Sequence, residues 1–167
     1  MIASVMSKKY KTLKSIGNCN SHICVPLTVL RLDDHEAAVV EMGMNHLGEI
    51  SKMTQIARPT ISVITNVGTS HIGNLGSREN ILKAKLEILE GMGVSDKIVI
   101  NNDNDMLHDW YLKNKVTKHI ITYGIENESD IMAKNIVSLE DGSKFEVEVD
   151  GNIYEAEINV RRRTFCI

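Results

Sequence analysis

The chain is poor in residues that mark several common protein classes. Its 167 residues include two prolines and three cysteines, and aromatic residues make up 4%. Because the cysteine count is odd and no C-x-x-C pair occurs, we expect neither a disulfide nor a zinc knuckle, and we expect a reducing cytoplasm as the setting. The net charge of -3 comes without a basic patch, which argues against nucleic-acid binding. No run of about 18 apolar residues predicts a membrane span.

What the sequence does contain is the pattern of an α/β protein with a parallel-rich sheet flanked by helices. Apolar runs bounded by turn signals alternate with amphipathic stretches, and continuous apolar residues predict buried strands. After Ala133 the apolar residues alternate instead, and Asp150-Gly151-Asn152 predicts the turn of a small antiparallel hairpin. We predict strands at 37–42, 60–66, 97–101 and 118–123, helices at 1–9, 21–32, 48–58, 77–90 and 103–114, and hairpin strands at 145–149 and 153–158.

One lysine lies where helical spacing predicts an apolar residue. Residues three and four positions from Lys85 are all apolar, whereas most of those around Lys83 are polar. We therefore expect Lys85 to face the core and Lys83 the solvent. A lysine in a low-dielectric setting has a lowered pKa and becomes a neutral nucleophile. The alternative is a side chain whose stem is packed while its charged end reaches water.

Polar residues follow three of the predicted strands, where ligands bind in open α/β sheets. They are Glu41, Asn66 and Asn101, and His71 follows the second of these strands after a short loop. A carboxylate, an imidazole and an unusual lysine at one edge suit Mg²⁺ that also holds phosphate oxygens. Simpler interpretations remain open: a solvated glutamate, an ordinary loop histidine, and a helix N-cap in the Asn101–Asp105 loop.

Several motifs occur together in one order: GNCNSHIC at 17–24, EMGMNHLGEI at 41–50, TNVGTSH at 65–71, AKLEI at 84–88 and INND at 100–103. In combination they resemble the central, ATP-binding domain of the Mur ligase family, over nearly all of residues 1–160. The branch that fits best joins D-Ala-D-Ala to UDP-N-acetylmuramoyl-tripeptide in peptidoglycan synthesis. Such ligases use ATP to convert a substrate carboxylate into an acyl phosphate, which the incoming amine then attacks.

The resemblance assigns roles to residues of this sequence. It implies that Glu41 and His71 bind Mg²⁺, and that Lys85 carries a carbamate that supports a second Mg²⁺. It implies adenine contact by Asn101, with Asn66 in the same nucleotide site. Asn18 and Asn20 would belong to the loop near the reacting phosphate and the substrate, with Asn18 catalytic and Asn20 substrate-binding.

The sequence also departs from the family pattern. The G-K-T/S phosphate loop and its strand would precede residue 1, and the loop GNCNSHIC has Ser21 for asparagine and Cys24 for glycine. We therefore expect a fragment that is inactive alone and monomeric, with Met1 an internal start and 161–167 a frameshift-derived tail. Two alternatives are another Mur-like ligase, either the third-residue-adding enzyme or a folylpolyglutamate synthetase, and a non-catalytic nucleotide-binding remnant.

Overall fold

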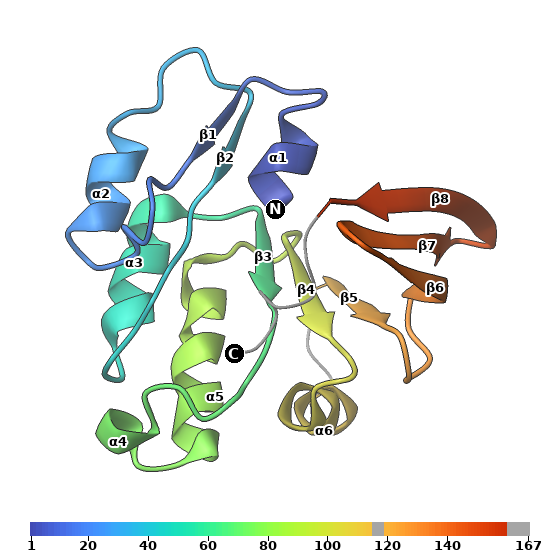
Figure 1. The fold of residues 1–167 in the computed structure, drawn as a ribbon. Helices are drawn as coiled ribbons and strands as arrows, with labels where there is room; N and C mark the ends of the chain where they lie inside the picture. The colour runs from blue at the N-terminus through green and yellow to red at the C-terminus, as the bar shows by residue number, and fades with distance from the viewer. Residues whose placement is uncertain (115–118, 160–167) are drawn as a thin grey trace. The chain divides into compact units, whose positions relative to one another are not determined.

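The computed structural model describes residues 1–114 and 119–159, and these fall into two compact units (Figure 1). The first unit combines residues 1–60 with 71–93, and the second combines 61–70 with the described part of 94–167. Within the described residues, no helix has the length and apolar character needed to cross a bilayer.

The first unit is mainly helical and contains a two-stranded sheet. Strand β1 pairs with β2 in parallel, with Leu13 opposite Ala38. The elements are α1 (Ile2–Met6), β1 (Thr12–Lys14), α2 (Cys24–Val29), β2 (Ala37–Val39), α3 (Glu49–Ala57), α4 (Ile72–Leu75), α5 (Arg78–Leu86) and the 3-10 helix η1 (Glu87–Gly91).

Helix α3 lies at the centre of the packing in the first unit. Its Met53 is fully buried, as are Val25 of α2 and Ala84 of α5. Helix α3 approaches η1 so closely that a Cβ on Gly91 would collide with the carbonyl of Thr54, and glycine is therefore required there. The buried Glu87 of η1 accepts hydrogen bonds from the backbone N–H of Gly48 at 2.7 Å and of Ser51 at 3.2 Å. This carboxylate satisfies N–H groups at the start of α3 that have no partner within the helix.

The second unit is built on a six-stranded sheet in the order β3-β4-β5-β6-β7-β8. Strands β3 to β6 run parallel, and β6, β7 and β8 are antiparallel neighbours. Ile98 and Ile100 of β4 and Leu107 of α6 are fully buried. The elements are β3 (Ile61–Ile64), β4 (Lys97–Asn101), α6 (Asp105–Lys113), β5 (His119–Gly124), β6 (Ile131–Leu139), β7 (Gly142–Val149) and β8 (Asn152–Ile158).

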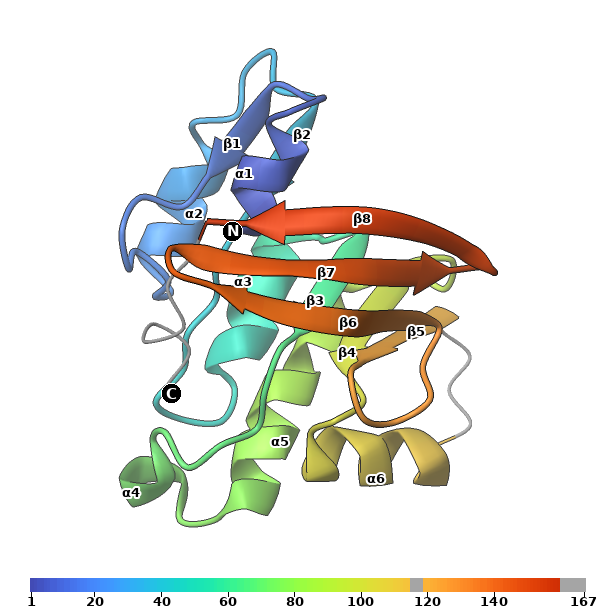
Figure 2. The same cartoon turned by 45° about the vertical axis from the view of Figure 1, so that its right-hand side comes forward.

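Charged side chains pair across neighbouring strands in the antiparallel part of this sheet. Figure 2 shows β6, β7 and β8 as long, curved neighbours. Lys134 pairs with Glu148, and Lys144 pairs with Glu155 at 3.1 Å. The connection between β7 and β8 has positive φ at Asp150 (51°) and Gly151 (75°), the geometry expected of a tight hairpin turn.

The predicted fold class is confirmed: the chain is an α/β protein whose larger sheet is parallel from β3 to β6 and ends in an antiparallel hairpin. The prediction that Glu41, Asn66 and Asn101 follow strands of one sheet is wrong for Glu41, because among the described strands β2 pairs only with β1, in a separate two-stranded sheet. Strands β1 and β6 and helix α4 were not predicted; β1 and α4 are too short to show a period. The proposed tail at 161–167 lies outside the described residues.

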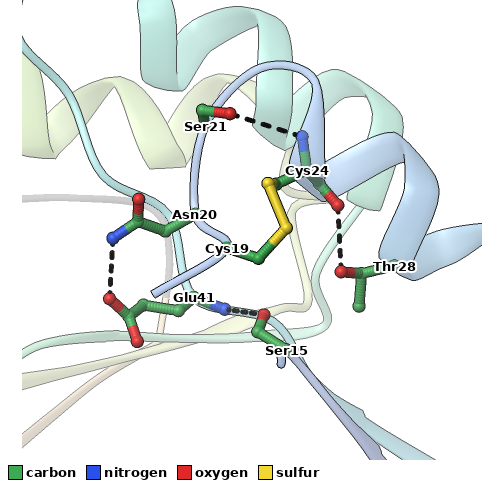
Figure 3. The surroundings of a disulfide bond; sticks show 7 residues. All are labelled: Ser15, Cys19, Asn20, Ser21, Cys24, Thr28 and Glu41. Atoms are coloured by element: carbon green, nitrogen blue, oxygen red, sulfur yellow. Dashed lines mark hydrogen bonds between the residues drawn. A yellow bond between two sulfur atoms is a disulfide. The ribbon is translucent and has the colours of Figure 1, made fainter. Parts of the chain in front are cut away.

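The expectation of no disulfide is also wrong. Cys19 and Cys24 are bonded to each other, with their Cα atoms 5.1 Å apart (Figure 3). The chain turns between Cys19 and the first residue of α2, which is Cys24, and this brings the two side chains within bonding range. A cysteine count and a search for C-x-x-C spacing cannot detect such a turn.

Candidate functional site

Lys85 lies on α5 and turns inward, as helical spacing predicted. The helix begins after Ser77, whose hydroxyl accepts a hydrogen bond from the N–H of Asn80 at 3.3 Å. Lys85 is half-buried and Lys83 is exposed. Burial lowers the pKa of the Lys85 ammonium group, because a charge is poorly solvated away from water. Lys85 therefore has more of the neutral amine near neutral pH than an ordinary lysine.

Glu41 is held by the loop that precedes α2. It comes two residues after β2, and its carboxylate Oε1 accepts a hydrogen bond from Asn20 Nδ2 at 2.8 Å (Figure 3). Its backbone N–H donates to Ser15 Oγ at 3.0 Å, directly after β1. Asn20 is fixed in turn, because its carbonyl accepts from the N–H of Gly43 at 2.8 Å. Two residues predicted for the site, Asn20 and Glu41, are thus in direct contact.

Gly43 leaves no room for a side chain beside Asn20. A Cβ on Gly43 would lie 2.9 Å from Asn20 Cγ and 2.9 Å from Nδ2, closer than side-chain contacts normally come. Asn20 therefore lies between the Gly43 backbone and the Glu41 carboxylate.

The other predicted residues of the first unit are exposed. Asn18 follows Gly17 in the loop before α2. His71 is the N-cap of α4 and has a positive φ of 65°, an uncommon conformation for a non-glycine residue. Among the described residues, no three His, Cys, Asp or Glu side chains form a metal-binding group. The predicted ligands are one glutamate, one histidine and a modified lysine, and only two of these belong to the four residue types. The finding therefore does not test them, and the predicted metal ligands stay a prediction.

In the second unit, the ends of β3 and β4 are joined by asparagine side chains. Asn101 Nδ2 donates to the Thr65 carbonyl at 3.1 Å, and Asn104 Nδ2 donates to Asn66 Oδ1 at 2.8 Å. Asn104 Oδ1 also accepts from the N–H of Leu107 at 3.1 Å and caps α6. Asn66 and Asn101 are thus both part of one polar edge, as parallel strands that end together require.

Asp103 organises the next loop, a role that sequence reasoning missed. Its carboxylate accepts hydrogen bonds from the backbone N–H groups of Ile125 at 2.6 Å, Glu126 at 3.1 Å and Asn127 at 2.8 Å. Burial alone would raise the pKa of Asp103, but the three hydrogen bonds outweigh it and the pKa is lowered. Burial and the nearby Asp103 charge raise the pKa of Tyr123. The available signal for this role was the run of Asn and Asp after β4. The N–H groups that Asp103 binds lie over twenty residues further along the chain, so the run does not identify them.

The chain belongs to the Mur ligase middle-domain family, since the sequence model of that family matches residues 1–163. The UDP-N-acetylmuramoyl-tripeptide–D-alanyl-D-alanine ligase of Buchnera aphidicola subsp. Baizongia pistaciae is 34% identical to it over 156 residues, covering 92% of this chain and 34% of that protein. Our chain thus spans about a third of the length of this relative.

Solved structures agree with this assignment. The crystal structure of MurF from Acinetobacter baumannii matches with a TM-score of 0.86 and 28% identity, over 95% of this chain and 35% of that one. MurF from Thermotoga maritima, crystallised in complex with ADP, matches with a TM-score of 0.81 and 25% identity, over 93% of this chain and 36% of that one.

Proposed function

We propose that this chain is the central, nucleotide-binding part of an ATP-dependent ligase that joins D-Ala-D-Ala to UDP-N-acetylmuramoyl-tripeptide. The observation that carries the proposal is the 34% identity, along 92% of the chain, to a ligase of that name. ATP would phosphorylate the tripeptide carboxylate, and the amine of D-Ala-D-Ala would displace the phosphate to form the amide bond. The setting would be the cytoplasm, where ATP is made, and the protein a monomer.

The first unit would supply the metal-binding and phosphate-facing residues. Asn20 occupies only Oε1 of the exposed Glu41, and within the described residues no hydrogen bond takes Oε2, so this oxygen suits a cation. Mg²⁺ would supply charge neutralisation for the phosphates. Glu41 and His71 would be ligands, and Asn18 and Asn20 would face the reacting phosphate and the substrate.

Lys85 would become an anionic carbamate that joins this metal site. The neutral amine adds to carbon dioxide with loss of one proton, and the product carries a negative charge that suits a second Mg²⁺. Only the unprotonated amine reacts, so the lowered pKa of Lys85 favours the reaction.

The second unit would bind the nucleotide at the polar edge formed by Asn66 and Asn101. Asn101 donates one amide hydrogen to the Thr65 carbonyl, and its second amide hydrogen is available to an acceptor such as an adenine nitrogen. The relative crystallised with ADP supports nucleotide binding on this fold.

Two measurements on the full chain test the proposal. Carbon-13 NMR with labelled carbon dioxide should show a carbamate signal that Lys85→Arg removes and the matched control Lys83→Arg retains. Isothermal titration should show binding of Mg-ATP. Nucleotide binding without a carbamate would favour the non-catalytic remnant, and the absence of both would overturn the proposal. A turnover assay with UDP-muramoyl-tripeptide and D-Ala-D-Ala tests the expectation that the chain is inactive alone, and measurable ligation would contradict it.

A further inference from the structure

The Cys19–Cys24 disulfide lies beside the residues that hold Glu41. It closes a short ring in which Asn20 directly follows Cys19, and both cysteines are half-buried rather than enclosed in the core. Figure 3 shows Asn20 pointing toward the Glu41 carboxylate from the loop that the disulfide ties to α2. The bond is therefore within reach of small thiols and within one residue of a contact in the candidate site.

The two ends of this bond are anchored very differently. Cys24 is the first residue of α2, and the next residue, Val25, is fully buried. Cys19 is in the loop, where its N–H donates to the Ile16 carbonyl at 3.0 Å. The disulfide therefore fastens a loop to a packed helix, and the loop's own link to the Glu41 region runs through the side chain and carbonyl of Asn20.

We propose that Cys19 and Cys24 form a reversible thiol–disulfide site that sets how firmly Asn20 holds Glu41. In the oxidised chain the loop is fixed and the Asn20–Glu41 hydrogen bond is maintained. In the reduced chain the loop gains conformational freedom and the contact opens more often. Disulfides of proteins in reducing compartments are typically transient or redox-sensing, which agrees with this role. The inference rests on the proposed function only in making Glu41 a metal ligand.

The chemistry needs a small-molecule disulfide such as oxidised glutathione. One cysteine thiolate attacks it, forms a mixed disulfide and releases one glutathione thiolate. The second cysteine thiolate then displaces the other glutathione and closes the Cys19–Cys24 bond. The two cysteine protons end on the two glutathione thiols, so two protein thiols are oxidised as one glutathione disulfide is reduced.

The test compares the two redox forms of the full chain in a Cys166→Ser background, which leaves only this pair. Intact mass and peptide mapping follow formation of the bond with oxidised glutathione and its loss with an excess of reduced glutathione. Hydrogen exchange then reports on the Gly43 amide, which donates to Asn20. Its protection should fall roughly thirtyfold on reduction, by the loop-closure entropy of so short a ring. The Asn102 amide, bonded to the Tyr123 carbonyl in the second unit, is the internal control and should not change.

Three results would overturn the proposal. They are failure of the Cys19–Cys24 disulfide to form with oxidised glutathione, its persistence in excess reduced glutathione, and equal Gly43 protection in both forms. Cys24→Ser provides an independent check. Its Gly43 protection should match that of the reduced form with either oxidised or reduced glutathione. Exchange at Gly43 requires neither nucleotide nor metal. Failure of Mg-ATP binding would therefore count against the proposed function and leave this result standing.

Discussion

Replacing Asp103 by asparagine should destabilise the chain measurably, because one carboxylate organises three backbone N–H groups. Asparagine keeps an oxygen for the N–H groups of Glu126 and Asn127, but its NH₂ group would face the N–H of Ile125, now bonded at 2.6 Å. Hydrogen bonds to charged groups contribute about 1.5–3 kcal/mol each. Ile125 is 58% exposed, so water can reach the freed N–H, and the low end of that range applies.

We therefore expect Asp103→Asn to lower the free energy of unfolding by about 1.5 kcal/mol at neutral pH. With a urea dependence of about 2 kcal/mol per molar, the unfolding midpoint would fall by about 0.7 M. Asp109→Asn is the matched control. Asp109 lies on α6 and forms an exposed ion pair with Lys113, so its replacement should change the free energy by less than about 0.5 kcal/mol.

The effect should also depend on pH in one direction. The pKa of Asp103 is lowered in the folded chain, so its carboxylate stabilises the fold above the unfolded pKa of about 4. That contribution disappears as the pH falls through the folded pKa. Urea unfolding of both chains should give a difference that narrows below about pH 4. Equal midpoints at neutral pH, or a gap that does not change with pH, would refute this account of Asp103.

Two further substitutions test contacts in the first unit. Glu87→Gln removes the charge at the start of α3 and one of two backbone hydrogen bonds, so the free energy of unfolding should fall by about 1–2 kcal/mol in urea titrations; an unchanged midpoint would contradict the capping role. Gly43→Ala should displace Asn20, since the added Cβ would lie 2.9 Å from it, and should shift the Asn20 side-chain amide signal in NMR. Gly73→Ala has open space and should leave that signal in place, so equal shifts in both variants would contradict the contact.

Regular periodicity explains what the sequence could predict. Helical spacing identified Lys85 as inward-facing because the apolar pattern runs along α5 and continues into η1. Asn66 and Asn101 could be placed together because the ends of neighbouring parallel strands lie at one edge. A Mg²⁺ site was expected from the residue types at the strand ends, whereas the carbamate on Lys85 and the nucleotide contacts of Asn66 and Asn101 came from the family resemblance.

Contacts made by short or distant segments could not be predicted in this way. Strands β1 and β2 have three residues each, too few to show which sheet they join. The bond from Asn20 to Glu41 spans 21 positions and depends on the space left by Gly43. The Asn20–Glu41 contact was not predicted, because a loop sequence without periodicity does not show how the backbone folds.

The outermost strand of the larger described sheet, β8, bears on the chain's behaviour at high concentration. An unpaired strand edge can take up a strand from another molecule. Glu155 and Glu157 lie on the same face of β8, since side chains alternate along a strand. If a second copy laid its β8 alongside in antiparallel register, glutamates would come to lie opposite glutamates. The resulting repulsion opposes edge-to-edge growth into aggregates.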